Sequence, residues 1–204
     1  MQRKPTTKAF WMGKLPHWEV EDGRYFVTMH LRGAIPAAGR RRLATLADQL
    51  RTIPDRESPP WVLQQRAIFK ELERWLDRSQ WEPKLAQPEI ASIIMEAIEH
   101  RQQRGTWQML QFVVMPTHLH FFCEVGNQEL KPILEDFKRW TGHQAAKLLS
   151  QSGTRFWQSE WFDHWSRSED QDDRIVNYIR YNPVKAGLVR EYTQWPYGSW
   201  FGAK

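Results

Sequence analysis

The chain has 204 residues, of which 41% are hydrophobic and 26% charged, which fits one globular domain with a real core. No apolar run approaches the roughly 20 residues of a membrane helix, and no secretory signal is apparent, so we expect a cytoplasmic protein without a membrane partner. Cys123 is the single cysteine, which excludes an intramolecular disulfide, and a net charge of +5 combined with 12 tryptophans favours a nucleic-acid partner.

The N-terminal part of the chain is predicted to contain one strand and a helical insertion. Residues 1–22 are expected to form a flexible arm. The β-rich segment 25–31 predicts a strand. Apolar residues at helical spacing within 36–84 then predict two helices. Three prolines separate these helices, namely Pro54, Pro59 and Pro60.

The rest of the chain is predicted to alternate helices and strands. The expected elements are a helix at 88–100, strands at 107–115 and 118–125, a helix at 130–149, a strand at 156–165 and a helix at 170–182. Only two residues separate the first two strands, so they should form an antiparallel hairpin. Pro183 is expected to end the last helix, because the residue before a proline avoids helical angles. Residues 184–204 should form a tail that packs back through Leu188, Trp195 and Trp200.

This order of elements predicts an α+β fold, in which helices pack on an antiparallel sheet. We expect a single domain over residues 23–204, with the insertion at 36–84 and the C-terminal tail included in it.

Two histidines stand two residues apart at the start of a predicted strand. Side chains at i and i+2 of a strand share a face, so His118 and His120 project together, as two ligands of one metal ion must. Imidazole binds several divalent metals, so the pair does not indicate which metal is bound. Two polar residues on an open sheet face would give the same pattern.

The predicted C-terminal helix carries a phenol and an amide on one face. Tyr178 and Asn182 are four residues apart, and Ile175, Val176 and Ile179 supply the buried side. An amide oxygen can bind a hard cation, and a phenol can act as a nucleophile when a metal polarises the phosphate that it attacks. An amphipathic helix with a half-buried tyrosine and a terminating asparagine is the alternative.

Four segments resemble the HUH single-tyrosine transposases, and in particular their REP-associated class (RAYT), which is related to bacterial insertion-sequence transposases. These segments are YFVTMHLRGAIP (25–36), VVMPTHLHFFCEV (113–125), FWQSEWFDHW (156–165) and DRIVNYIRYNPVKAGLV (173–189). The similarity runs from about Tyr25 to Trp200. One departure is Thr117, which stands where the family usually has asparagine.

The resemblance implies a role for each matching residue. His118 and His120 match the paired metal ligands, Tyr178 matches the nucleophile, and Asn182 matches a polar third ligand. The implied cofactor is a divalent metal, Mg²⁺ or Mn²⁺. The implied fold is a ferredoxin-like or RRM-like antiparallel sheet with helices on one face.

The resemblance also implies a reaction and a partner. Tyr178 would attack a DNA phosphodiester, leaving a 5′-phosphotyrosine and a free 3′-OH, and strand transfer would reverse this step. The substrate would be a single-stranded DNA hairpin of a repetitive palindromic element, bound by a monomer or homodimer in the bacterial nucleoid. Arg174, Lys138 and Arg139 are candidate DNA contacts, although Arg174 is equally explained as a solvated charge.

Two alternatives remain open from the sequence. The first is a protein on the same scaffold that binds DNA hairpins and no longer cleaves them. The second is a metalloenzyme that uses His118, His120 and Glu124 as a two-histidine, one-carboxylate site. Tyr181, three residues from Tyr178, is a possible second phenol, although a packing or surface role fits it better.

Overall fold

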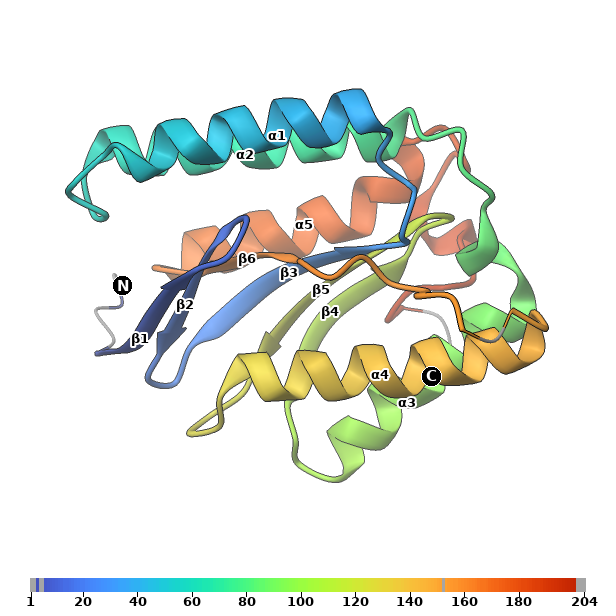
Figure 1. Cartoon of the computed structure of the whole chain (residues 1–204). Helices are drawn as coiled ribbons and strands as arrows, with labels where there is room; N and C mark the ends of the chain where they lie inside the picture. Colours follow the sequence, from blue (N-terminus) through green and yellow to red (C-terminus); the bar gives the residue numbers. More distant parts are fainter. Residues whose placement is uncertain (1–2, 4–5, 152, 201–204) are drawn as a thin grey trace.

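The computed structural model describes residue 3, residues 6–151 and residues 153–200 (Figure 1). Parts of the predicted arm and of the predicted tail lie outside the described residues, namely 1–2 and 4–5 in the arm and 201–204 in the tail. Among the helices of the described part, none has the length and apolar character that spanning a bilayer requires.

Four antiparallel strands form the central sheet. They are β3 (Arg24–His30), β4 (Gln108–Val114), β5 (His118–Glu124) and β6 (Phe162–Trp165), in the spatial order β4-β5-β3-β6. One helix precedes β4 and another follows β5, so the sheet has the split βαββαβ connectivity of ferredoxin-like folds. The predicted α+β fold and the predicted hairpin of β4 and β5 are confirmed.

Helices cover both faces of this sheet, whereas we expected them on one face. Helices α3 (Pro88–Gln103) and α4 (Leu130–Leu148) lie on one side, and α5 (Glu169–Lys185) lies on the other (Figure 1). Strand side chains alternate between the two faces, and β5 is buried on both of them at every residue but Glu124. Phe121 packs towards Trp107 on the α3–α4 side, whereas His120 faces Tyr178 of α5.

The predicted helical insertion consists of α1 (Ala37–Arg51), α2 (Pro59–Asp77) and the short 3₁₀ helix η1 (Lys84–Ala86). Ser58 caps α2 by accepting a hydrogen bond from the Trp61 backbone, and the two prolines that follow Ser58 sit in the first turn, where no amide donor is needed. Figure 1 shows α1 and α2 side by side, beyond α5 on the same side of the sheet.

The expected N-terminal arm is wrong for residues 7–20, which form a two-stranded hairpin of β1 (Thr7–Met12) and β2 (Pro16–Val20). Long-range contacts hold it in place. The Glu19 carboxylate accepts hydrogen bonds of 3.0 Å from the backbone amides of Leu130 and Lys131, and so caps α4. His17 bonds to Asp163 of β6. The hairpin therefore fastens α4 to the edge strand.

Two other boundaries differ from the predictions. Strand β6 begins at Phe162 and not at 156, because the chain leaves the ladder after an isolated bridge between Leu31 and Trp157. Helix α5 continues through Pro183 to Lys185. The helix is terminated by Gly187, two residues further on, whose φ of 71° fits the left-handed turn of a Schellman motif.

The C-terminal tail packs against β4, as predicted, and contains the 3₁₀ helix η2 (Tyr192–Gln194). The Trp195 indole donates a 2.9 Å hydrogen bond to the Val114 carbonyl, and Val113 bridges to Gly198. Leu188 departs from the prediction, because it is 40% exposed.

Candidate active site

The two predicted metal ligands lie side by side on β5, on the face that α2 and α5 cover. Their ring centroids are 4.7 Å apart, and their neighbours across the ladder are His30 and Thr28 of β3. His118 is 2% exposed and His120 is fully buried. The face is therefore closed by helices, which argues against two polar residues on an open sheet.

Threonines orient both imidazoles. Thr28 Oγ1 lies 2.9 Å from His120 Nδ1, and Thr117 Oγ1 lies 3.3 Å from His118 Nδ1. The Nε2 atom of each histidine is buried without a hydrogen-bond partner in the described part of the chain. Burial, followed by the neighbouring His120, holds the pKa of His118 well below its usual value, so His118 is neutral. A neutral imidazole with a fixed Nδ1 and a free Nε2 is prepared to bind a metal.

Tyr178 meets this pair from α5. Buried Ile175 and Ile179 fix the apolar side of the helix, and Tyr178 projects to the sheet with its ring centroid 5.5 Å from that of His120. Its hydroxyl donates a hydrogen bond to the carboxylate of Glu73 on α2. The phenol, the two histidines and the carboxylate thus converge within a single chain.

Asn182 lies one helical turn beyond Tyr178 and is 1% exposed. Neither its amide oxygen nor its amide nitrogen has a hydrogen-bond partner among the described residues. Leaving such an amide buried and unsatisfied costs about 1–3 kcal/mol, so a further group is needed to satisfy it. The Asn182 oxygen and the Nε2 atoms of His118 and His120 are therefore donor atoms that could hold a divalent metal.

Glu73 is the site residue that the sequence analysis missed. It is 4% exposed, and its Oε2 atom lies 3.5 Å from His120 Nε2 as well as accepting the bond from Tyr178. A signal was present in the sequence. Glu73 falls at helical spacing from Phe69 and Leu76, so it places a charge on the apolar side of α2.

The alternative carboxylate, Glu124, does not join the histidines. It lies four residues along β5 from His120, about 13 Å at strand spacing, and forms a 2.9 Å ion pair with Arg24. Within the described ranges, no group of three or more His, Cys, Asp or Glu side chains is placed to hold a metal ion. The two-histidine, one-carboxylate site with Glu124 is therefore wrong.

The predicted DNA contacts fall in different places. Arg174 lies on α5 and lines a pocket together with Tyr178. Lys138 and Arg139 lie on α4, across the sheet from α5, where Lys138 donates to the Ser159 carbonyl and Arg139 pairs with Asp136 at 2.6 Å. The structure therefore brings Arg174, but not the α4 pair, to the candidate site.

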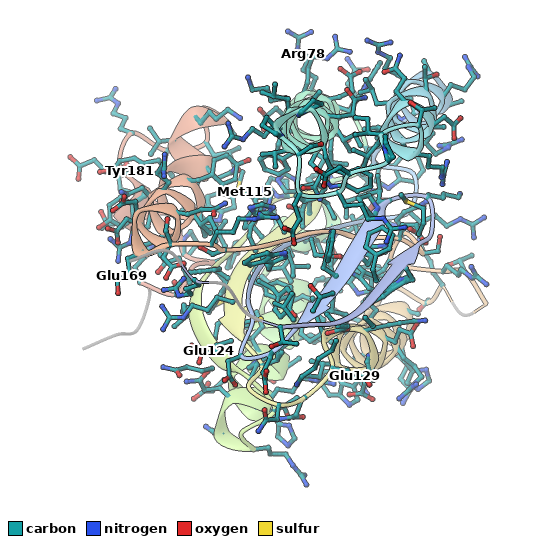
Figure 2. All side chains as sticks on the ribbon, turned by 90° about the vertical axis from the view of Figure 1, so that its left-hand side faces the viewer. Arg78, Met115, Glu124, Glu129, Glu169 and Tyr181 are labelled. Carbon is teal, nitrogen blue, oxygen red and sulfur yellow. The ribbon has the colours of Figure 1, made fainter. Side chains whose placement is uncertain are left out.

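Tyr181 points away from the histidines. It is 54% exposed on the outer side of α5, as Figure 2 shows, and its ring contacts Tyr192 at 5.4 Å. This position agrees with the expected surface role and leaves Tyr178 as the phenol at the site.

No family profile matches the chain. A REP-associated tyrosine transposase of Escherichia coli (strain K12) is 25% identical over 109 residues, a stretch that spans 52% of this chain and 62% of the length of that relative. The solved structure of a REP-associated tyrosine transposase bound to a REP hairpin superposes with a TM-score of 0.56 and 17% identity, over 92% of this chain and 82% of that one. In sequence over about half of its length, and in fold over most of it, the chain is thus similar to REP-associated tyrosine transposases.

Proposed function

We propose that this protein is a metal-dependent single-strand DNA endonuclease and strand transferase that acts on DNA hairpins through Tyr178. The observation that carries this proposal is the position of the Tyr178 phenol, which faces His120 and bonds to Glu73 beside two histidine nitrogens that have no hydrogen-bond partner in the described part of the chain. Such a convergence of a nucleophile, a proton acceptor and orphaned ligand atoms is typical of a catalytic site.

His118, His120 and Asn182 would hold the metal, Mg²⁺ or Mn²⁺, through side-chain atoms that have no hydrogen-bond partner among the described residues. When bound, the metal polarises the phosphate and stabilises negative charge on its oxygens. Thr117 and Thr28 keep both imidazoles in the orientation that leaves Nε2 free. The helices α2 and α5 exclude water from the two histidines.

Tyr178 supplies the covalent chemistry. Its oxygen bonds to phosphorus as the bond from phosphorus to the 3′-oxygen breaks, and the proton of the phenol passes to the Glu73 carboxylate. The leaving 3′-oxygen takes up a proton from water and becomes a 3′-OH. The product is a 5′-phosphotyrosine, from which a different 3′-OH can release the strand and restore the phenol. A tyrosine is a poor nucleophile at its free pKa of about 10, so removal of its proton by Glu73 assists the attack.

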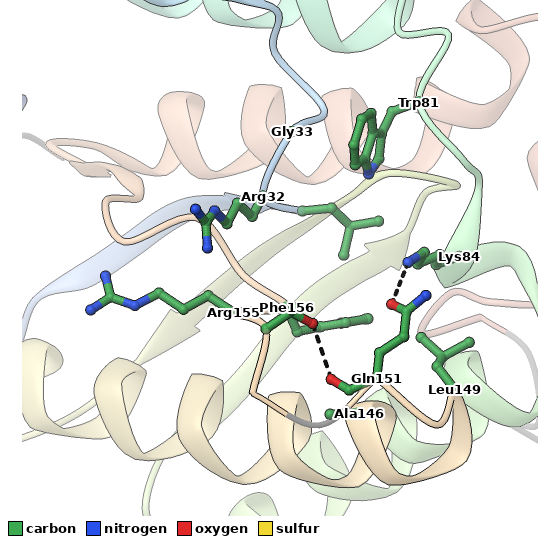
Figure 3. Close-up of a pocket in the computed structure, with 11 residues that line it drawn as sticks. Arg32, Gly33, Trp81, Lys84, Ala146, Leu149, Gln151, Arg155 and Phe156 are labelled. Atoms are coloured by element: carbon green, nitrogen blue, oxygen red, sulfur yellow. Dashed lines mark hydrogen bonds between the residues drawn. The ribbon is translucent and has the colours of Figure 1, made fainter.

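A basic, aromatic surface past the end of β3 supports a DNA partner. A cavity of 560 Å³ lies where β3 ends, and Figure 3 shows Trp81 and Lys84 on one side of it and Arg32 and Arg155 on the other. Trp81 is 46% exposed, so part of its ring is accessible to a base. This cavity, the net charge and the hairpin bound to the solved relative favour a DNA hairpin as substrate.

The test uses the full chain and labelled single-stranded hairpins drawn from palindromic repeats in the DNA that flanks its gene. With Mn²⁺ or Mg²⁺, we expect a protein–DNA adduct that survives a denaturing gel, and tighter binding to the hairpin than to the same sequence as a perfect duplex. Tight binding without any adduct would overturn the nuclease and favour a hairpin-binding protein.

A further inference from the structure

A separate pocket lies where α1 of the insertion meets the end of β3 and the segment that leads into β6. Its volume is about 230 Å³, below the roughly 300–1,000 Å³ of sites for drug-sized molecules, so it suits a smaller molecule. We call it the α1 pocket and define it by six of the residues that line it, namely His30, Arg40, Leu43, Leu72, Trp161 and Phe162. Tyr178, His118 and His120 do not line it.

The interior of the α1 pocket is apolar. Leu72, Trp161 and Phe162 are buried in its wall, and Leu43 of α1 is half-buried opposite solvent. Water finds few hydrogen-bond partners against such a wall, so an apolar occupant is favoured over water. The two aromatic side chains pack well with a further ring, either offset or edge to face. The interior therefore favours a small aromatic group.

One polar atom on the inner wall is left without a partner. His30 is 9% exposed, and its Nδ1 atom bonds to the Leu31 carbonyl at 3.0 Å. A carbonyl oxygen only accepts hydrogen bonds, so Nδ1 carries the proton and Nε2 of the neutral ring is an acceptor. No described residue donates to this Nε2 atom. A hydroxyl or N–H group on the inner end of an occupant would satisfy it.

The outer rim of the α1 pocket is positively charged. Lys14 and Arg40 are exposed there, and neither forms an ion pair with a described residue. Arg51 and Glu160 also line the pocket, but each pairs with a residue of opposite charge outside it. Arg40 spends one of its donors on the Ile35 carbonyl, at 2.8 Å, and keeps the others. Two uncompensated cations at the rim favour an occupant whose outer end is an anion.

We propose that the α1 pocket binds a small aromatic carboxylate that carries a hydroxyl or N–H group on the far side of its ring. The ring packs against Trp161 and Phe162, the hydroxyl or N–H group donates to His30 Nε2, and the carboxylate pairs with Arg40 and Lys14. Such an occupant contacts both helices of the insertion as well as β3, so it stabilises the insertion against the sheet.

The position of the α1 pocket connects its occupant to the candidate site. His30 lies opposite His118 in the ladder of β3 and β5, and Leu72 directly precedes Glu73 on α2. An occupant that orders α2 therefore also orders the helix that supplies the Glu73 carboxylate. Binding itself does not depend on the proposed function, because the residues that bind the occupant are not those that cleave DNA.

The test measures the affinity of the full chain for three probes by titration calorimetry. The first is 3-(4-hydroxyphenyl)propanoate, the second is 3-phenylpropanoate, which lacks the hydroxyl, and the third is 3-(4-hydroxyphenyl)propanamide, which lacks the charge. We expect the first to bind about tenfold more tightly than the second, which leaves His30 Nε2 unsatisfied. It should bind severalfold more tightly than the third, because the ion pairs at the rim are exposed and contribute less. The bound first probe should also slow hydrogen exchange in α1 and α2.

Substitutions in α1 and β3 locate the binding. Ala44 lines the rim at an exposed position, so Ala44→Glu adds a carboxylate there and should weaken binding of the first probe about tenfold. Ala44→Gln, which has the same size and no charge, should lose much less. The matched control is Thr45→Glu, the same charge at the next exposed position of α1 and outside the pocket. His30→Leu should abolish the preference for the first probe over the second.

The outcomes separate the pocket from the nuclease. If the wild type binds none of the probes, or if Ala44→Glu and Thr45→Glu lose equal affinity, the α1 pocket is not the proposed site. Unchanged hydrogen exchange in α1 and α2 with the first probe bound would contradict its effect on the insertion. None of these results bears on cleavage by Tyr178, which requires no occupant in the α1 pocket.

Discussion

The Tyr178 hydroxyl on α5 donates a hydrogen bond to the Glu73 carboxylate on α2, which lies 105 residues earlier in the chain. The same carboxylate lies 3.5 Å from His120 Nε2. The insertion after β3 is therefore part of the candidate site, because it supplies the carboxylate that accepts the hydrogen bond of the proposed nucleophile.

Glu73→Gln keeps the size of this side chain and removes its charge. We expect DNA binding to persist and the rate of cleavage to fall on the order of a hundredfold, as is usual when a general base is lost. Single-turnover cleavage of a labelled hairpin measures the effect. Glu71→Gln is the matched control, since Glu71 bonds to Trp75 and Arg74 on the far side of the same helix. Cleavage at the wild-type rate in Glu73→Gln would exclude the proton acceptor.

The sequence predicts the sheet and the site residues on it because these depend on local patterns. The spacing of His118 and His120 on a strand, and of Tyr178 and Asn182 on a helix, places each pair on one face without knowledge of the rest of the chain. The element order then gives the α+β plan.

The features that escaped prediction depend on distant partners. Glu73 acquires a role only when α2 folds over α5, and the β1–β2 hairpin is held by Glu19 at α4 and by His17 at Asp163. Helix α5 passes through Pro183, because its termination depends on the left-handed Gly187 rather than on the proline.

The proposed metal site predicts a metal-dependent gain in stability. A ligand present at a hundredfold above its Kd stabilises the folded state by about 2.7 kcal/mol, so Mn²⁺ should raise the Tm of the wild type. His118→Gln should abolish this shift and the cleavage, and EDTA should stop cleavage until Mg²⁺ or Mn²⁺ is restored. His143→Gln, at an exposed position on α4, should retain both properties. Undiminished cleavage in EDTA would contradict the assignment.

The hairpin anchor at His17 predicts a loss of stability at alkaline pH. Burial opposes its charge, but hydrogen bonds to Asp163 and Glu160 outweigh burial and raise the pKa of His17 to about 9. A histidine whose pKa is higher in the folded state stabilises that state. The contribution is complete at pH values below the unfolded pKa of about 6.5, and it is lost as the pH rises through about 9.

The measurement is the free energy of unfolding in denaturant from pH 6.5 to 9.5, for the wild type and for His17→Gln. The difference between the two curves should shrink as the pH rises. Other titrating groups contribute to both curves, and their contributions cancel in the difference. One of them is Lys138. Burial lowers its pKa to about 8, so its contribution to stability rises with pH in this range and opposes that of His17. Parallel curves would show that His17 carries no charge in the folded protein.

The nucleophile itself is tested by Tyr178→Phe, which removes one oxygen and almost no volume. The ring keeps its contacts with His120, Phe26 and Phe69, so the fold and the binding of a hairpin should persist. Cleavage and the covalent adduct should both disappear, because no other phenol faces the histidines in the described residues. Tyr181→Phe, at the exposed outer face of α5, should leave cleavage close to the wild-type rate. Mass spectrometry of the adduct trapped by the wild type locates the nucleotide, and its attachment to any residue other than Tyr178 would refute the mechanism.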